Sequence, residues 1–160
     1  MIMEGYERKF IHVGEIFIAS EKPMEIATVL GSCVGVCLYD RHHQIGALNH
    51  YLLPLWNGNG LQSPKFGNVS IPKMIEQMVS IGCQTTNMEA KLFGGANINK
   101  TNLENMMIGK KNIIIAKEIL AKHHIRIIAE DTGGTRGRRI LMQSDTNKIL
   151  LRYTGEYEDV

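Results

Sequence analysis

The sequence has few cysteines, prolines and aromatic residues, and its net charge is small. Its 160 residues include three cysteines and four prolines, and aromatic side chains make up only 6%. Three cysteines without a regular spacing exclude a disulfide-rich secreted scaffold and leave at least one free thiol. The 18 Lys and Arg against 16 Asp and Glu give a net charge of +2. This surplus is too small to indicate a nucleic-acid partner.

Long apolar runs are missing as well. No run of about 18 apolar residues could cross a bilayer. Residues 1–8 lack the basic patch and apolar stretch of a secretory signal. Together with a free thiol, these absences favour a cytoplasmic protein. The composition, 44% hydrophobic and 21% charged, is globular, and the length suits one domain, which we expect to extend over residues 1–160.

Short apolar runs and two amphipathic segments predict the fold. Strands are expected between residues 9 and 53, at 83–93, at 125–129 as a buried strand, and in a hairpin around 144–147. A long loop at 57–68 separates the first strands from the helices, and we expect it to form a mobile rim of the site. The order of elements predicts an α+β fold, in which mixed or antiparallel sheets are layered against two main helices on one face.

The two helices are expected from Ser70 to Gly82, with Pro72 in the first turn, and from Ile108 to His124. Each has an apolar stripe at helical spacing that should face the core. The predicted stripes are Ile71, Met74, Ile75, Met78 and Val79 in the first helix, and Ile113, Ala116, Ile119 and Leu120 in the second.

Cysteine and histidine occur on two neighbouring apolar runs that we expect to form an antiparallel hairpin. A two-residue loop after Asp40 would put Cys33 directly opposite His50. A three-residue loop would turn His50 to the other face, and a four-residue loop would restore a shared face. An imidazole near a thiol can take its proton and stabilise the thiolate. Cys33 is then expected to react with iodoacetamide well below the ordinary thiol pKa of about 8.5.

The residues around Cys33 suit attack on an amide or ester. Gly31 and Ser32 allow the backbone to turn, so that amide N–H groups near Ser32 and Cys33 could hold an oxyanion. A third group should orient the histidine. Thr28, Asn49 and a backbone carbonyl are all candidates at this point.

Other interpretations of the same residues lead to no cofactor. A free cysteine in a strand is most often a small core residue, which is our interpretation of Cys37 and Cys83. A zinc site from Cys33, Cys37, His42 and His43 is disfavoured, because a β run holds these thiols too far apart. The glycine-rich segments 94–99 and 133–139 match no nucleotide-binding motif. We therefore expect neither a cofactor nor a metal ion.

Arginines follow the second glycine-rich segment. Arg136, Arg138 and Arg139 could bind an acidic surface of a substrate or partner, or they could be the solvated end of a strand.

Five segments resemble the CheD family of chemoreceptor glutamine deamidases in the family's order. They extend over most of the chain, from about residue 10 to 153. The segments are Leu30–Asp40 (LGSCVGVCLYD), Gly46–Pro54 (GALNHYLLP), Lys91–Asn97 (KLFGGAN), Ile108–Asn112 (IGKKN) and Ala129–Arg138 (AEDTGGTRGR).

The resemblance implies a cysteine hydrolase that converts receptor glutamine side chains to glutamate and releases ammonia. It implies Cys33 as nucleophile, His50 as general base and Thr28 as third member, although some members carry that threonine six residues before the cysteine rather than five. Asn49 stands where many members have alanine and could alter the rim of the site. The implied fold is the layered one related to the catalytic domain of cytotoxic necrotising factor toxins.

The resemblance also implies partners. Methyl-accepting chemotaxis receptors would be the substrate, and a CheC-type phosphatase binds the deamidase in some organisms. Two alternatives remain: an adaptor that docks to a phosphatase or receptor with little or no catalysis, and a cysteine amidase or transglutaminase-like enzyme with another substrate.

Overall fold

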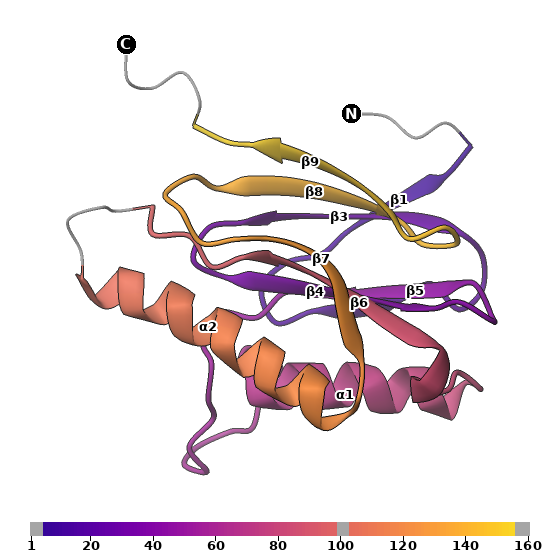
Figure 1. Cartoon of the computed structure of the whole chain (residues 1–160), viewed down its shortest axis with the longest axis horizontal. Helices are drawn as coiled ribbons and strands as arrows, with labels where there is room; N and C mark the ends of the chain where they lie inside the picture. Colours follow the sequence, from indigo (N-terminus) through magenta and orange to yellow (C-terminus); the bar gives the residue numbers. More distant parts are fainter. Residues whose placement is uncertain (1–4, 99–102, 156–160) are drawn as a thin grey trace.

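A computed structural model describes residues 5–98 and 103–155. The expected domain, 1–160, includes residues outside these ranges. The described chain forms two stacked sheets, one of four strands and one of five, and two helices lie under the five-stranded sheet (Figure 1). No helix in the described ranges is both long enough and apolar enough to span a membrane.

The two sheets are mixed, as the sequence predicts. The four-stranded sheet has the order β1 (Glu7–Phe10), β3 (Met24–Leu30), β8 (Arg138–Gln143) and β9 (Lys148–Tyr153). The five-stranded sheet has the order β2 (Ile16–Ile18), β5 (Ile45–Asn49), β4 (Val34–Asp40), β6 (Met88–Gly94) and β7 (Arg126–Thr132). The pairs β1–β3 and β6–β7 are parallel, and the other pairs are antiparallel.

The helices cover one face of the five-stranded sheet, which confirms the predicted layering. They are α1 (Gly67–Ser80) and α2 (Leu103–Lys122), and a short 3-10 helix, η1 (Thr85–Asn87), precedes β6. α1 ends near Gly82 as predicted, because Gly82 has φ +105° and the Cys83 amide donates back to the Met78 carbonyl. It begins at Gly67, however, so Pro72 lies in the second turn and not in the first.

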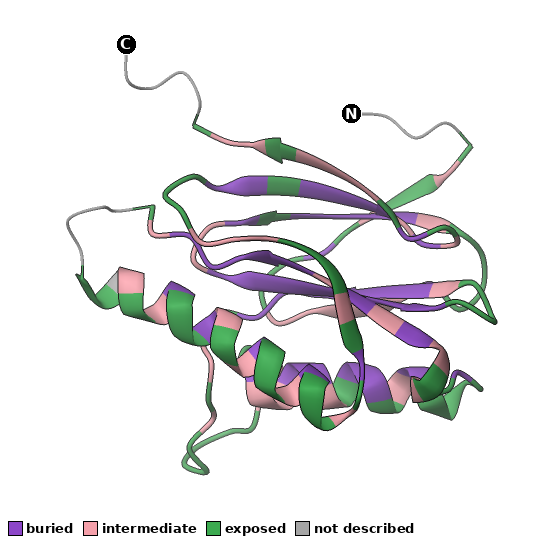
Figure 2. Cartoon of the chain, in the orientation of Figure 1, coloured by how far each residue is buried: buried purple, intermediate pink, exposed green. Residues whose placement is uncertain are grey.

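Two apolar layers hold the elements together. One lies between the two sheets and includes Ile26, Leu48 and Ile140, and the other lies between the five-stranded sheet and the helices. Buried residues accordingly gather on the central strands and on one side of each helix (Figure 2). The predicted helix stripes pack into the second layer, except for Val79, which is exposed.

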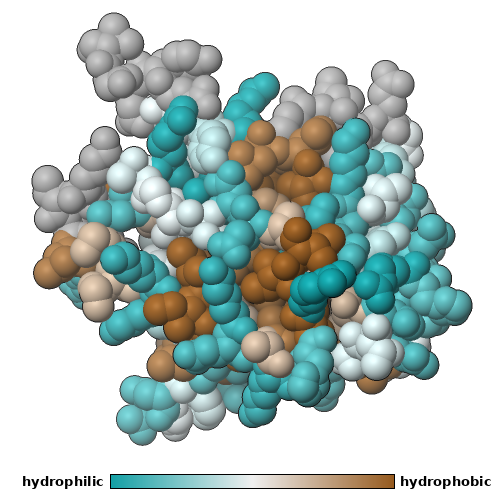
Figure 3. Space-filling view, viewed as in Figure 1, coloured by the Kyte–Doolittle hydropathy of each residue, from teal (hydrophilic) through white to brown (hydrophobic). Residues whose placement is uncertain are grey.

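The strand predicted as buried at 125–129 is the exposed edge strand β7. It pairs only with β6, and among its residues Ile128 is 40% exposed. Figure 3 shows apolar side chains (brown) in the middle of the face that carries α2 and β7. The strand predicted at 83–93 begins only at Met88, because η1 occupies the preceding residues.

Candidate active site

The chain changes sheets at Gly31–Cys33. β3 belongs to the four-stranded sheet and β4 to the five-stranded sheet, so these three residues form the corner between the layers (Figure 1). The sequence predicts the break at Gly31 and Ser32 but not the change of sheet. Cys33 therefore lies at an end of the apolar layer between the sheets, where it is 9% exposed.

The carbonyls of this corner are all hydrogen-bonded. The Ala96 amide donates to Gly31 O (3.0 Å), the Gly95 amide donates to Cys33 O (2.9 Å), and Asn112 Nδ2 donates to Ser32 O (3.0 Å). In a trans peptide the carbonyl and the following amide point in opposite directions. The Ser32 and Cys33 amides are thus turned away from these partners, and within the described chain neither donates to another residue. This arrangement suits the predicted oxyanion site.

Gly94 allows this close approach. It has φ +107°, and a Cβ atom at this position would lie 2.2 Å from the Cys33 carbonyl oxygen. Any larger residue would push the corner away from β6. The glycine-rich segment that begins at Gly94 is therefore explained by its contact with the Cys33 backbone and not by phosphate binding. Asn99, at the end of that segment, lies outside the described residues.

A four-residue loop, Arg41–Gln44, sets the register between β4 and β5. Asp40 pairs with Ile45, and the same register continues to the bridge between Val34 and Tyr51. Direct opposition of Cys33 and His50, as a two-residue loop would give, is therefore wrong. The four-residue loop still keeps both residues on the face toward the other sheet, with the two side chains diagonal to each other.

Thr28 and His50 meet across the layer between the two sheets. Thr28 Oγ1 lies 2.7 Å from His50 Nδ1, and it also donates to the Ile11 carbonyl at 2.8 Å. A threonine hydroxyl has one proton. Since that proton is donated to Ile11, the hydroxyl must accept from His50 Nδ1–H. The neutral ring then carries its lone pair on Nε2.

His50 Nε2 is buried and has no hydrogen-bond partner in the described chain. A buried acceptor without a partner is costly in a native protein and calls for a functional explanation. The tautomer that Thr28 and Ile11 impose leaves this nitrogen ready to accept a proton, as a general base must. His50 is 5% exposed.

Burial keeps both groups neutral at rest. It raises the pKa of the Cys33 thiol to about 11, although the Cys33 amide offsets part of this effect. It also lowers the pKa of His50 to about 4, with a further contribution from His12. Burial therefore argues against the expected thiolate–imidazolium pair at neutral pH in the free protein, because a dry layer disfavours both charges. Proton transfer must accompany attack on the substrate.

Alkylation of Cys33 by iodoacetamide tests this protonation state. Because the thiol pKa is raised, we expect the rate to keep rising from pH 8 toward pH 11, with no plateau near neutrality. His50→Ala should leave this profile in the alkaline range. Modification of Cys33 is followed by peptide mass spectrometry, which separates it from Cys37 and Cys83. A plateau below pH 8 that His50→Ala removes would establish an ion pair instead.

A groove of about 430 Å³ opens beside Thr28 and His50. Four of its other lining residues are apolar side chains that are about two-fifths exposed, and Lys65 adds a positive charge. The apolar residues with this exposure are Phe10, Val13, Val29 and Leu52. The groove can therefore receive a largely apolar surface next to the histidine.

Asn49 lies on the wrong face for the site. It is fully buried, accepts from the Val36 amide at 2.7 Å, and donates to Ser70 of α1 at 2.9 Å. It can neither orient His50 nor contact a substrate. Its role is to join β5 to α1.

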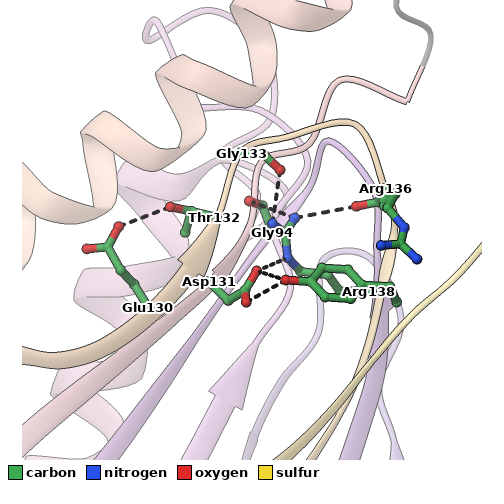
Figure 4. A network of polar contacts seen from close by, with 8 residues as sticks. Gly94, Glu130, Asp131, Thr132, Gly133, Arg136 and Arg138 are labelled. Carbon is green, nitrogen blue, oxygen red and sulfur yellow. Dashed lines mark hydrogen bonds and ion pairs between the residues drawn. The ribbon is translucent and has the colours of Figure 1, made fainter.

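Arg138 is also removed from the predicted partner surface. Its side chain is 4% exposed and donates to Asp131 (2.7 Å) and to the Gly133 carbonyl (3.0 Å), and one nitrogen lies 3.5 Å from the Gly94 carbonyl (Figure 4). The arginine therefore supports the loop that contacts Cys33. Arg136 is exposed, and its guanidinium lies 4.8 Å from the Tyr153 ring centroid.

The pair of Asp131 and Arg138 is expected to stabilise the fold. Burial alone would raise the pKa of Asp131, but hydrogen bonds from Tyr153 and Arg138 outweigh this effect and lower it. Asp131→Asn should cost about 2 kcal/mol, because Arg138 stays buried without a carboxylate. Thermal unfolding should show a fall of about 5 °C.

The neighbouring Glu130 provides the matched control. It pairs with Lys117 at 3.2 Å on the surface, with both side chains well exposed. Glu130→Gln should change stability by less than about 0.5 kcal/mol. Equal melting temperatures for the Asp131→Asn and Glu130→Gln variants would show that the buried pair does not stabilise the fold.

Comparison with known proteins identifies the family of this chain. Residues 52–153 match the family model described as CheD chemotactic sensory transduction. A protein of Sulfurimonas denitrificans, named probable chemoreceptor glutamine deamidase CheD, is 53% identical over 154 residues, which cover 96% of this chain and 98% of that protein. The chain belongs to the CheD family.

CheD relatives of similar length occur in distant organisms. Proteins with the same name are 43% identical over 142 residues in Trichlorobacter lovleyi and 40% identical over 147 residues in Thermococcus kodakarensis. These matches cover 89% of the chain in both cases, and 88% and 90% of the relatives. The family resemblance predicted from the sequence is thus confirmed along nearly the whole chain.

Asn112 is the residue of this CheD site that sequence reasoning missed. Its side chain is fully buried, and Nδ2 donates to Leu52 O (2.9 Å) as well as to Ser32 O. It therefore links Ser32 of the corner to the segment that follows β5 and contains His50. The sequence does contain an indication of this role, because Asn112 is a polar residue on the same helix face as the buried Ala116 and Leu120.

Proposed function

We propose that this chain is a chemoreceptor glutamine deamidase, formed as one domain over residues 1–160, with Cys33 as nucleophile, His50 as general base and Thr28 as the residue that orients His50. The observation that carries the proposal is the Thr28–His50 hydrogen bond, which leaves Nε2 free on the face shared with Cys33. The names of the curated relatives support the same reaction.

The first half of the reaction forms a thioester. Cys33 Sγ attacks the carboxamide carbon of a glutamine side chain while its proton passes to His50 Nε2. The Ser32 and Cys33 amides hold the oxyanion that forms on the former carbonyl oxygen. The C–N bond then breaks, and the proton on Nε2 goes to the departing nitrogen, which leaves as ammonia.

The second half restores the enzyme. His50 Nε2 takes a proton from water, whose oxygen attacks the thioester carbon. The C–S bond breaks, the sulfur regains a proton, and a glutamate side chain is released. Thr28 keeps the proton on Nδ1 throughout, so that the same nitrogen, Nε2, serves both halves.

The proposed substrate is the cytoplasmic part of a methyl-accepting chemotaxis receptor, and the proposed location is the cytoplasm. The apolar groove beside His50 suits the exposed side chains around a glutamine on a helix surface. Each conversion adds one negative charge to the helix, which changes the repulsion between neighbouring helices. A CheC-type phosphatase is the second proposed partner.

Ammonia release tests the proposal. The purified chain is mixed with a receptor cytoplasmic fragment, and ammonia is measured with time by a coupled dehydrogenase assay. We expect one ammonia for each glutamine converted, with glutamate at those positions by peptide mass spectrometry. Binding to the fragment without any ammonia above the background of the fragment alone would instead favour the adaptor function.

A further inference from the structure

Three potential metal ligands meet at the end of β4 that lies away from Cys33. Asp40, His43 and Cys83 each place one ligand atom so that all three atoms lie within 4.8 Å of one another. His43 Nδ1 is 3.2 Å from Asp40 Oδ1. Asp40 and Cys83 are buried, with exposures of 0% and 2%, whereas the His43 side chain is 36% exposed.

The Asp40 carboxylate is held in place by three backbone amides. The His42 and His43 amides donate to Oδ1 at 2.9 and 2.8 Å, and the Gln84 amide donates to Oδ2 at 3.0 Å. A carboxylate has about four acceptor positions, so at least one remains on Oδ2. Carboxylates that bind metals are commonly oriented by such outer hydrogen bonds. The first ligand is thus already fixed in direction.

We propose that Asp40, His43 and Cys83 bind a zinc ion. Thiolate, imidazole and carboxylate are the three ligand types that zinc takes in proteins. Bond lengths of about 2.0–2.3 Å require ligand atoms about 3.3–3.7 Å apart in a tetrahedron. The observed cluster reaches this spacing if the exposed His43 side chain turns slightly. Cys83 releases its thiol proton to solvent as the metal–sulfur bond forms.

His43 also lines an open hollow at the surface. A surface depression of about 380 Å³ is lined by His42, His43, Gly82, Gln84 and Asn87. Water can therefore reach the metal. The His42 ring, whose centroid is 5.0 Å from that of His43, is a second source of a ligand.

This set differs from the zinc site that the sequence analysis weighed and disfavoured. A zinc site from Cys33, Cys37, His42 and His43 is excluded, because Cys33 and Cys37 lie in the layer between the sheets. Cys83 comes from the segment after α1, some 40 residues along the chain from His43. Bound zinc would join the β4–β5 hairpin to the segment between α1 and η1 and stabilise the fold. The site lies about 20 Å along β4 from Cys33, so its presence or absence leaves the proposed deamidase reaction untouched.

Cobalt and zinc titrations of the full chain test the site. After treatment with a chelator, Co²⁺ should bind one per chain and give a thiolate-to-cobalt charge-transfer absorption, which Zn²⁺ should displace. Cys83→Ser should abolish that absorption and weaken zinc binding at least about 10-fold. His43→Ala, a change on the surface that should not prevent folding, should weaken zinc binding similarly.

Cys33→Ser is the matched control, because it removes a thiol that lies outside the proposed metal site. Its cobalt and zinc titrations should equal those of the unaltered chain. Zinc should also raise the melting temperature of the unaltered chain but not that of His43→Ala. Absence of one-to-one binding at micromolar metal would overturn the proposal. So would an absorption that survives Cys83→Ser, or one that Cys33→Ser removes.

Discussion

Cys33→Ala is expected to reduce the rate of ammonia release from a receptor fragment by at least about 10⁴-fold. Losses of this size follow removal of a nucleophile, because no other group can form the covalent intermediate. Binding of the fragment should change little, since the sulfur contributes only a small part of the contact surface at 9% exposure. The rate is measured at saturating fragment, and binding is measured separately.

Cys37→Ala serves as the control for this prediction. Cys37 is a fully buried thiol in the same apolar layer, four residues along the chain, and burial raises its pKa to about 12. Its replacement should leave the rate within about threefold. If activity survives Cys33→Ala but is lost in Cys37→Ala, the nucleophile is Cys37 and not Cys33.

Thr28→Val is expected to lower kcat by about 100-fold or more with little change in KM. Valine has the shape of threonine but cannot accept the His50 Nδ1 proton, so the ring loses both its orientation and its preferred tautomer. Thr28→Ser, which keeps the hydroxyl, should restore most of kcat. Nitrogen NMR of the histidine ring should show the proton on Nδ1 in the unaltered chain and a mixture of tautomers in Thr28→Val.

Two outcomes would contradict this role for Thr28. One is an unchanged kcat in Thr28→Val, and the other is an equal loss in the Thr28→Ser variant. A purely structural role would lower the stability of Thr28→Val without any change in the tautomer signal. The NMR measurement therefore separates orientation of His50 from simple packing in the layer between the sheets.

Local patterns in the sequence predicted most elements. The Gly31–Ser32 break, the amphipathic stripe of α1 and the hairpin at 144–147 each depend on residues close together in the chain, and each is present. The edge position of β7 was missed because its apolar residues suggest burial, whereas exposure depends on which strands pair with it. The β4–β5 register depends on the four-residue loop, in which Gln44 takes a positive φ that its residue type does not favour.

Contacts between segments that are distant in the chain could not be predicted from local sequence patterns. Thr28 lies in the four-stranded sheet, whereas His50 directly follows β5 of the other sheet, and the Asn112 side chain reaches the Cys33 corner from α2. Residue patterns left Thr28, Asn49 and a backbone carbonyl open as groups to orient the histidine, and the family resemblance favoured Thr28. The fold excludes Asn49, because neighbouring residues along an extended segment point to opposite layers. The closeness of Cys83 to Asp40 could not be predicted from the sequence either, because it depends on where the fold places the segment after α1.

Acid-quenched mass spectrometry of the working enzyme shows directly whether Cys33 forms a covalent intermediate with the substrate. The chain is mixed with a receptor fragment, stopped within the first turnover and digested. We predict that the peptide containing Cys33 carries a thioester to a substrate glutamine that has lost ammonia, and that the adduct is absent in the Cys33→Ala variant. Glutamate formation without any adduct on Cys33, or an adduct on another residue, would contradict the account.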